Sequence, residues 1–273
     1  MPQSSPLSAA DIARYIDFME LLAADASAVT MRYFRQPLDV INKKDGAEFD
    51  PVTIADREAE TAIRARIAQE YPTHTIIGEE HDTKQGASQF SWIIDPIDGT
   101  RSFVAGVPLW ATLIALNDGT KPRIGMMHQP YTGETFLGWP GGAELRTTAA
   151  RTPLKTKTTE NLNEAIVGCT DPAMFNATER AAFRSLNEQI RLRRFGGDSY
   201  FYCLLAAGFI DLVVEAGLQP YDIQALIPII EGAGGIVTNW RGGDPQQGGQ
   251  IIAAANGVLH AKALDLLKPA ALT

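Results

Sequence analysis

The chain has 273 residues and a mass of 29.6 kDa, with 24 Lys and Arg against 32 Asp and Glu, which gives a formal net charge of −8 and a pI near 5.1. This acidic balance argues against a nucleic-acid partner, because proteins that bind the phosphate backbone usually present an excess of positive charge. The 45% hydrophobic content is enough to fill the core of one large domain or two closely joined ones.

Cysteine usage and the N-terminus indicate the compartment. The chain has two cysteines, Cys169 and Cys203, which leaves nothing for a disulfide framework or a cysteine-rich zinc site. The N-terminus has no basic start and reaches Asp11 before any apolar run, so it does not resemble a secretory signal. Apolar stretches such as 107–116 are shorter than the ~18–20 residues that cross a membrane. We therefore expect a cytoplasmic protein without a membrane partner.

The N-terminal part of the chain predicts two helices. Between residues 9 and 35, apolar residues recur every three or four positions, which is the period of a helix that buries one face. After a loop, Thr53 and Asp56 have capping-box spacing, with Asp in the position usually taken by Glu. Apolar residues then continue at helical spacing to Pro72, so a second helix is expected to start near Asp56.

The middle of the chain changes to the pattern of β-strands. Short apolar segments are separated by Gly, Pro and Asn-Asp-Gly turns, which is typical of a largely antiparallel sheet. The segments are TIIG, SWIID, ATLIAL, IGMMH and TFLGW.

Strands and helices alternate after Arg151. Strands are expected at IVGC, 210–215, GIVT and IIAAA, and helices at 176–189, 199–207, 222–232 and from Leu259 onward. The Pro-, Gly- and Thr-rich stretch 139–153 is the best candidate for a boundary between two halves. We therefore predict an N-terminal α+β half over residues 1–148 and a C-terminal α/β half over residues 149–273.

The segment DPIDGT, residues 95–100, carries the clearest chemical signal. An apolar strand ends in Asp95, the following proline holds that residue in an extended conformation, and Asp98 comes three positions later. Gly99 and Thr100 then begin an expected helix, whose first N–H groups and dipole favour a phosphate. The segment can also be an ordinary turn, since turns use the same residues. On the functional interpretation, a metal ion and an anion bind side by side.

Further acidic residues stand where strands end or helices begin. Glu79 and Glu80 follow TIIG, Asp56 closes the string DPVTIAD, and Asp222 lies at an expected helix start. Ligands of layered α/β folds bind at such positions. If these carboxylates converge, a cation is needed to offset their repulsion. The four histidines do not form a zinc-like pair, so oxygen ligands and Mg²⁺ are expected.

These motifs together resemble those of the inositol monophosphatase superfamily of magnesium-dependent phosphatases. The resemblance spans roughly residues 10 to 265 and rests on GEE at 78–80, DPIDGT at 95–100, the DPVTIAD element and YDIQALIPIIEGAGG from Tyr221. It implies a layered αβαβα sandwich, the sugar phosphatase fold, and commonly a homodimer. The apolar segment 104–116 is a candidate for the dimer contact or for the core.

The resemblance also implies roles for individual residues. The first Mg²⁺ is expected at Glu79, Asp95 and the carbonyl of Ile97, and the second at Asp95, Asp98 and Asp222. Glu79 is also the expected ligand of a third, weaker ion. As catalytic residues, Glu79 and Thr100 orient the attacking water and Asp56 supports Thr100, while the amides of Gly99 and Thr100 bind the phosphate. Two or three ions per site are expected.

Within the superfamily, the chain most resembles bacterial histidinol-phosphate phosphatases, on DPIDGTRSFVAGVPLW, RFGGDSYFY and DLVVEAGLQPYDIQ. Arg101 and Tyr221 depart from the inositol enzymes, which usually carry an uncharged residue and a Trp there. Asp198 and Glu215 would place two anions near the leaving group, which suits an aminoalcohol better than a neutral polyol. The expected substrate-binding residues are Gly99, Thr100, Arg101, Gly197, Asp198 and Glu215.

Alternatives remain at this point. Asp198 can instead cap the helix after it, Arg101 can form a surface ion pair, and Lys43 is a candidate for contact with the water network of the site. Inositol 1-phosphate, 3′-phosphoadenosine 5′-phosphate and fructose 1,6-bisphosphate remain possible substrates, and a non-catalytic metal-binding regulator remains a possible role. Haloacid-dehalogenase phosphatases use D-x-D-G-T, whereas the spacing here is D-x-x-D-G-T, which argues against their chemistry.

Overall fold

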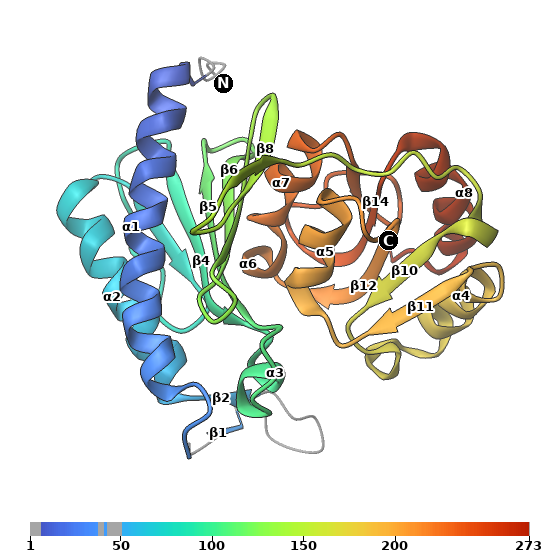
Figure 1. Ribbon diagram of the computed structural model, residues 1–273, viewed down its shortest axis with the longest axis horizontal. Coiled ribbons are helices and arrows are strands. Elements are labelled where there is room, and N and C mark those ends of the chain that lie inside the picture. The colour runs from blue at the N-terminus through green and yellow to red at the C-terminus, as the bar shows by residue number, and fades with distance from the viewer. Residues whose placement is uncertain (1–6, 38–40, 43–50, 273) are drawn as a thin grey trace.

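Two β-sheets alternate with three layers of helices in the computed structural model, which describes residues 7–37, 41–42 and 51–272 (Figure 1). The order of layers is helices, a seven-stranded sheet, helices, a five-stranded sheet and helices. The predicted αβαβα sandwich is therefore confirmed. Three buried apolar clusters fill the contacts between successive layers.

The first layer consists of α1 (Ala9–Tyr33) and α2 (Ile54–Glu70), which cover one face of the seven-stranded sheet. Ser8 caps α1 by accepting a hydrogen bond from the backbone N–H of Asp11. Thr53 and Asp56 form the predicted capping box, with Asp56 as its third helical residue, so α2 starts two positions before Asp56. The short strands β1 (Ile41–Asn42) and β2 (Pro51–Val52) precede α2 and pair with each other.

The seven-stranded sheet has its strands in chain order, and only its first pair, β3 and β4, is parallel. This arrangement matches the expected largely antiparallel sheet. The strands are β3 (Thr75–Gly78), β4 (Ser91–Asp98), β5 (Ala111–Asn117), β6 (Pro122–Gln129), β7 (Glu134–Trp139), β8 (Gly142–Arg146) and β9 (Arg151–Pro153).

The central layer is made by α5 (Asp198–Ala206), α6 (Pro220–Ile223) and α7 (Leu226–Gly232), which lie between the two sheets (Figure 1). Residues 222–232, expected as one helix, form two, because α6 ends at Ile223 before α7 begins. The seven-stranded sheet meets this layer closely: a Cβ on Gly125 would collide with the carbonyl of Ala225, and a Cβ on Gly138 with the backbone of Ile229.

The five-stranded sheet is mixed and has the order β11-β10-β12-β14-β13. Its far face is covered by α4 (Ala177–Asn187) and α8 (Gly257–Leu267), and short α3 (Thr100–Val104) follows β4. The strands are β10 (Ile166–Cys169), β11 (Leu192–Phe195), β12 (Leu212–Leu218), β13 (Ile236–Asn239) and β14 (Gly249–Ala254). Short 3-10 helices lie at Leu162–Glu164, Pro172–Met174 and Lys268–Ala270.

The stretch 139–153, chosen as the boundary between halves, carries β8 and β9 rather than a loose linker. β9 lies beyond position 148 but pairs with β8, so the seven-stranded sheet extends to Pro153. The division of the chain into halves at 148/149 itself stays a prediction. β11 was not expected, because its four residues are exposed and lack an apolar alternation.

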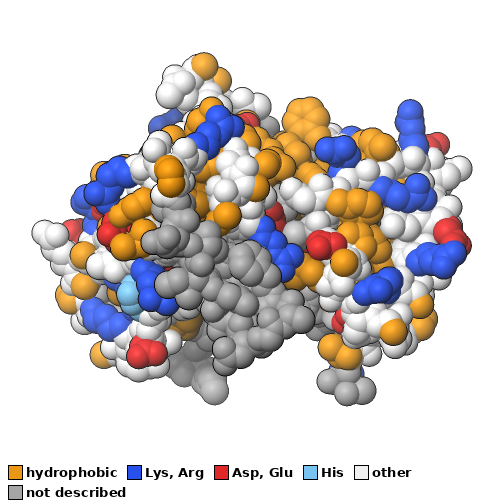
Figure 2. Space-filling view, turned by 90° about the horizontal axis from the view of Figure 1, so that it is seen from below, with side chains coloured by type: hydrophobic (Ala, Val, Ile, Leu, Met, Phe, Trp, Pro, Cys, Tyr) orange, Lys and Arg blue, Asp and Glu red, His pale blue; other side chains and the backbone are white. Residues whose placement is uncertain are grey.

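Three further features concern the helices, the cysteines and the surface of the described residues. Within the described ranges, no helix combines the length and apolar character needed to cross a bilayer. Cys169 and Cys203 are both buried thiols without a disulfide. On the face shown in Figure 2, basic, acidic and apolar side chains are mixed over both lobes of the molecule.

Candidate active site

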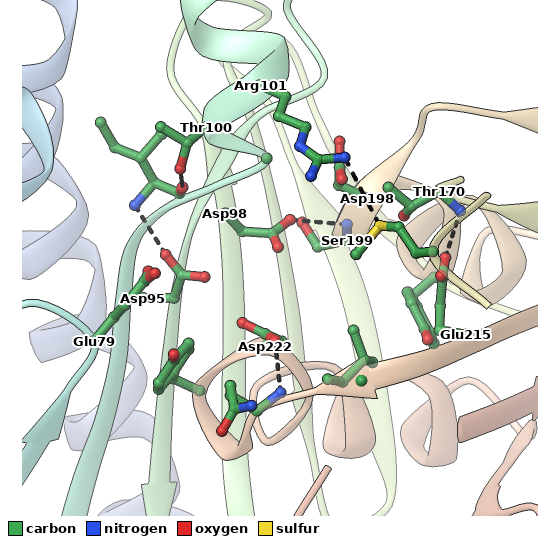
Figure 3. A pocket seen from close by; sticks show the side chains of 18 of the residues that line it. Glu79, Asp95, Asp98, Thr100, Arg101, Thr170, Asp198, Ser199, Glu215 and Asp222 are labelled. Carbon is green, nitrogen blue, oxygen red and sulfur yellow. Dashed lines mark hydrogen bonds between the residues drawn. The ribbon is translucent and has the colours of Figure 1, made fainter. Parts of the chain in front are cut away.

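The predicted site residues gather at a cavity where strands of both sheets end (Figure 3). Glu79 follows β3, Asp95 lies within β4 and Asp98 ends it, and Glu215 is the middle residue of β12, where the pairing with β14 becomes irregular. Asp222 reaches the cavity from α6. The two sheets thus supply opposite walls. The strand-end expectation holds for Glu79 and Asp98, whereas the strand expected at 210–215 continues to Leu218, so Glu215 lies inside it. Lys43 lies outside the described residues.

Three carboxylates form the centre of the cavity. One oxygen from each of Asp95, Asp98 and Asp222 lies within 4.8 Å of the others. Each aspartate is oriented by a backbone N–H group: Ile97 donates to Asp95 at 3.0 Å, Ser199 to Asp98 at 2.9 Å, and Gln219 to Asp222 at 2.7 Å. The geometry leaves their other oxygens directed at a shared space, as Figure 3 shows.

The electrostatics of this group favour a bound cation. Burial raises the pKa of Asp95 and Asp222 well above the usual range, and the pKa of Asp98 to about 7. Mutual repulsion adds to the effect of burial, and the Glu79 carboxylate contributes to the rise at Asp95. A cluster of oxygen ligands with this excess of negative charge fits a hard divalent ion. The donor set therefore suits the expected metal, with Glu79 beside Asp95.

The turn between β4 and α3 brings the aspartate cluster close to the amides that are expected to bind phosphate. The pairing of β4 with β5 is irregular between Asp95 and Asp98, which lets both side chains reach the cavity. Gly99 has a φ of +78°, a left-handed conformation that glycine adopts without strain. The expected helix is only five residues long, so any phosphate contact there depends on the local amides of Gly99 and Thr100 more than on a helix dipole.

Thr100 connects this turn with Asp56. Its hydroxyl lies 3.1 Å from the carbonyl of Ile97 and 3.5 Å from Oδ1 of Asp56, while Thr53 donates to the other Asp56 oxygen. The Ile97 carbonyl has two lone pairs, so it can accept from Thr100 and still face a cation. Burial raises the pKa of Asp56 to about 6. Asp56 therefore contacts the site through Thr100 rather than lining the cavity.

The far wall of the cavity carries Asp198 and Glu215. Asp198 is the first residue of α5 and has a φ of +44°, and its carboxylate accepts a hydrogen bond from Ser102 at 3.2 Å. It does not cap the helix, since Gly197 holds the cap position. Burial raises the pKa of Glu215 to about 8 even though the Thr170 N–H donates to it at 2.6 Å. Both carboxylates face the cavity (Figure 3).

Arg101 and Gly197 differ in their relation to the cavity. Arg101 lines it and is exposed, with its guanidinium 3.9 Å from both a carboxylate oxygen of Asp171 and the sulfur of Met174. Gly197 does not line it, and a Cβ there would collide with the ring of Phe201. Gly197 thus allows α5 to pack closely, and its predicted contact with substrate stays a prediction.

Several lining residues were missed by the sequence reasoning. Thr170 directly follows β10, so the strand-end rule could have found it. Met174, Ser199 and Tyr202 gave no comparable signal, because each resembles an ordinary residue of a loop or an apolar helix.

Comparisons with known proteins agree with this geometry. The model of the inositol monophosphatase family matches residues 11–270. The chain is 36% identical to the bifunctional phosphatase IMPL2, chloroplastic, of Arabidopsis thaliana, and the match covers 97% of this chain and 78% of that protein. It is 34% identical to a histidinol-phosphatase of Chlorobaculum parvum, and that match covers 87% of this chain and 90% of that protein. A solved inositol monophosphatase from Zymomonas mobilis is similar with a TM-score of 0.84 and 35% identity, covering 96% of this chain and 100% of that one.

Proposed function

The chain belongs to the inositol monophosphatase family and has the acidic site of a metal-dependent phosphomonoesterase, and we propose that it hydrolyses L-histidinol phosphate to L-histidinol and phosphate. The observation that carries the choice of substrate is the pair of carboxylates, Asp198 and Glu215, on the wall opposite the metal cluster. A relative named histidinol-phosphatase supports the same choice.

The cofactor in this proposal is Mg²⁺, two to three ions per site. Glu79, Asp95 and the Ile97 carbonyl would hold the first ion, Asp95, Asp98 and Asp222 the second, and Glu79 the third. Bound divalent ions supply Lewis acidity, which lowers the pKa of water and stabilises the attacking and leaving oxygens of an in-line displacement. The remaining steps belong to side chains and amides of the chain itself.

The residues around the turn after β4 bind the phosphate and orient the attacking water. The amides of Gly99 and Thr100 take the phosphoryl oxygens, which lie beside the aspartate cluster. Glu79 and the Thr100 hydroxyl hold the water on the side of the phosphorus opposite the leaving group. Asp56 accepts a hydrogen bond from Thr100, and its pKa of about 6 places this carboxylate close to the pH at which it can take up a proton.

In this proposal, the negative charge of Asp198 and Glu215 selects a substrate whose leaving group is positively charged. Glu215 is buried, and its raised pKa means that its ionised form lacks a countercharge in the protein alone. An ammonium group placed between Glu215 and Asp198 would supply that charge and keep both groups ionised. A neutral polyol would leave the repulsion in place. Arg101, at the mouth of the cavity, is a further candidate for substrate contact.

Competing esters test the proposal. We expect a higher kcat/KM for histidinol phosphate than for inositol 1-phosphate in the presence of Mg²⁺. Glu215→Gln and Asp198→Asn should each abolish this preference, because they remove one anion and keep the shape of the side chain. An equal or reversed preference in the unmodified protein would contradict the substrate assignment while leaving the phosphatase activity intact.

Inositol 1-phosphate is the second candidate substrate, favoured by the similarity to the Zymomonas mobilis inositol monophosphatase. A 3′(2′),5′-bisphosphate nucleotidase and a regulator without catalysis are the further alternatives. Release of phosphate from 3′-phosphoadenosine 5′-phosphate would identify the nucleotidase, whereas a regulator would release phosphate from none of the esters. The homodimer and the cytoplasmic location remain predictions. Residues 110–116 of the segment 104–116 are buried and contribute to the core, whereas Val104 and Val107 are exposed, so a dimer contact would have to use the earlier part of the segment.

A further inference from the structure

Two buried hydroxyl groups on α5 have no assigned role. Tyr202 and Ser199 lie one helical turn apart, both line the cavity, and they are only 2% and 3% exposed. The Tyr202 hydroxyl has no hydrogen-bond partner within the part of the chain that the structure describes, whereas the Ser199 side chain interacts with the Asp98 carboxylate. A buried polar group without a partner destabilises a fold, so such groups are normally satisfied by a ligand or an ordered water.

The surroundings of Tyr202 make its hydroxyl the more informative of the two. The carboxylates of Glu215, Asp98 and Asp222 all raise the pKa of this phenol, after burial as the largest cause. The side chain lines the same cavity as the aspartate cluster and Glu215. Glu215 already accepts from the Thr170 N–H, and the Cys169 thiol lies 3.9 Å from its other oxygen.

A neighbouring tyrosine shows the contrast. The hydroxyl of Tyr200, two positions earlier on the same helix, donates to the carboxylate of Glu134. Tyr200 is not among the residues that line the cavity. A structural tyrosine on α5 thus has its partner within the protein, whereas the tyrosine at the cavity has none among the described residues.

We propose that Tyr202 is a specificity-determining residue, whose phenol oxygen accepts a hydrogen bond from the ammonium group of an aminoalcohol phosphate. The inference rests on the proposed substrate class and adds a neutral acceptor to the acidic wall. An ammonium has three N–H donors, and Glu215, Asp198 and Tyr202 offer three acceptors along one cavity. A phenol suits the third place because another carboxylate would add to the repulsion already present.

The test compares Tyr202→Phe with Tyr200→Phe as a matched control. For each protein, kcat and KM are measured with Mg²⁺ for histidinol phosphate and for p-nitrophenyl phosphate, whose leaving group has no ammonium. Binding of free L-histidinol is measured by calorimetry, and the melting temperature without ligand is recorded. These readouts separate recognition of the leaving group from an effect on the metal cluster or on the fold.

We expect Tyr202→Phe to lower kcat/KM for histidinol phosphate about ten-fold more than for p-nitrophenyl phosphate, mainly through KM. Binding of L-histidinol should weaken by a similar factor, and the melting temperature should stay equal or rise, because the variant removes an unpaired hydroxyl. Tyr200→Phe should lower the melting temperature without changing the ratio between the two esters.

Other outcomes overturn the inference. An equal loss on both esters would show that Tyr202 acts on the metal cluster, and an unchanged ratio with a lower melting temperature would show a structural hydroxyl paired with water. If the unmodified protein prefers histidinol phosphate and Tyr202→Phe keeps that preference, only this inference is wrong. If the unmodified protein cleaves p-nitrophenyl phosphate but not histidinol phosphate, the proposed function is wrong as well.

Discussion

Ser199 donates its backbone N–H to Oδ2 of Asp98 at 2.9 Å, although 101 residues separate the two in the sequence. The bond joins the start of α5 to the last residue of β4, so one member of the aspartate cluster is held by the opposite wall of the cavity. The cluster is therefore complete only when both walls are in place.

Asp98→Asn should lower kcat/KM for any phosphate ester at least about a hundred-fold. The amide keeps the shape and still accepts from Ser199, but it removes one charge from the group that holds the cation. The measurement is phosphate release at saturating Mg²⁺, together with calorimetric Mg²⁺ affinity. Asp17→Asn, an exposed change on α1, is the control and should have no effect. Activity that survives Asp98→Asn would refute the metal assignment.

Thr100→Ala should lower kcat about a hundred-fold, while Thr100→Ser should stay within several-fold of the unmodified protein. The reason is the hydroxyl, which both Asp56 and the Ile97 carbonyl contact and which only the serine retains. Mg²⁺ affinity should change little in either variant. Thr61→Ala, which removes an exposed hydroxyl on α2, serves as the control. Equal activity of the alanine and serine variants would exclude a role for the hydroxyl.

Without divalent metal, the melting temperature should fall as the pH rises from 6.5 to 8.5. Asp98 and Glu215 have pKa values of about 7 and 8 in the fold, against roughly 4 in an unfolded chain. A raised pKa means that the folded state keeps its proton at a pH where the unfolded chain has lost it, so stability falls with rising pH until the group has also ionised in the fold. The measurement is thermal unfolding in a chelator across this range.

Two controls accompany the pH series. Glu215→Gln should show a shallower decline, because one titrating group is gone. Saturating Mg²⁺ should reverse the trend, because a bound cation favours the ionised carboxylates. A melting temperature that is flat or rises with pH in the chelator would contradict the raised pKa values.

Gly138→Ala should destabilise the protein by about 1–3 kcal/mol or more, because the added methyl group would collide with the backbone of α7 at Ile229. The measurement is chemical unfolding monitored by tryptophan fluorescence. Gly257→Ala is the control: it stands at the first position of α8, where a Cβ would make an ordinary 3.4 Å contact with Ile236. A similar loss in both variants would argue against the close approach of β7 and α7.

The elements that the sequence predicted well are those whose local signals agree with their environment. The capping box of Thr53 and Asp56 and the helical period after it depend on neighbours along the chain, and α2 forms accordingly. β11 was missed because an exposed edge strand needs no apolar alternation; its residues Leu192–Phe195 are held by pairing with β10. Pairing partners distant in the sequence are invisible to a periodicity argument.

Some residues of the site could likewise be predicted from the sequence, and others could not. Asp95, Asp98 and Asp222 could be identified because acidic residues at strand ends and helix starts are informative by themselves, and the structure brings them together. Tyr202 could not be identified in this way, because it lies within the apolar run of α5 and resembles an ordinary core aromatic residue. Its unpaired hydroxyl becomes evident only when the residues around it are known.

The left-handed backbone conformation of Asp198 affects which residues evolution can place at this position. An aspartate with a φ of +44° is less favourable than glycine at the same place, yet it directs a carboxylate into the cavity. Selection for thermal stability alone would favour glycine at this position, whereas under the proposed function selection for discrimination among esters would retain the acid. Under the proposed function, replacing Asp198 by glycine would therefore give a more stable protein with lower substrate selectivity.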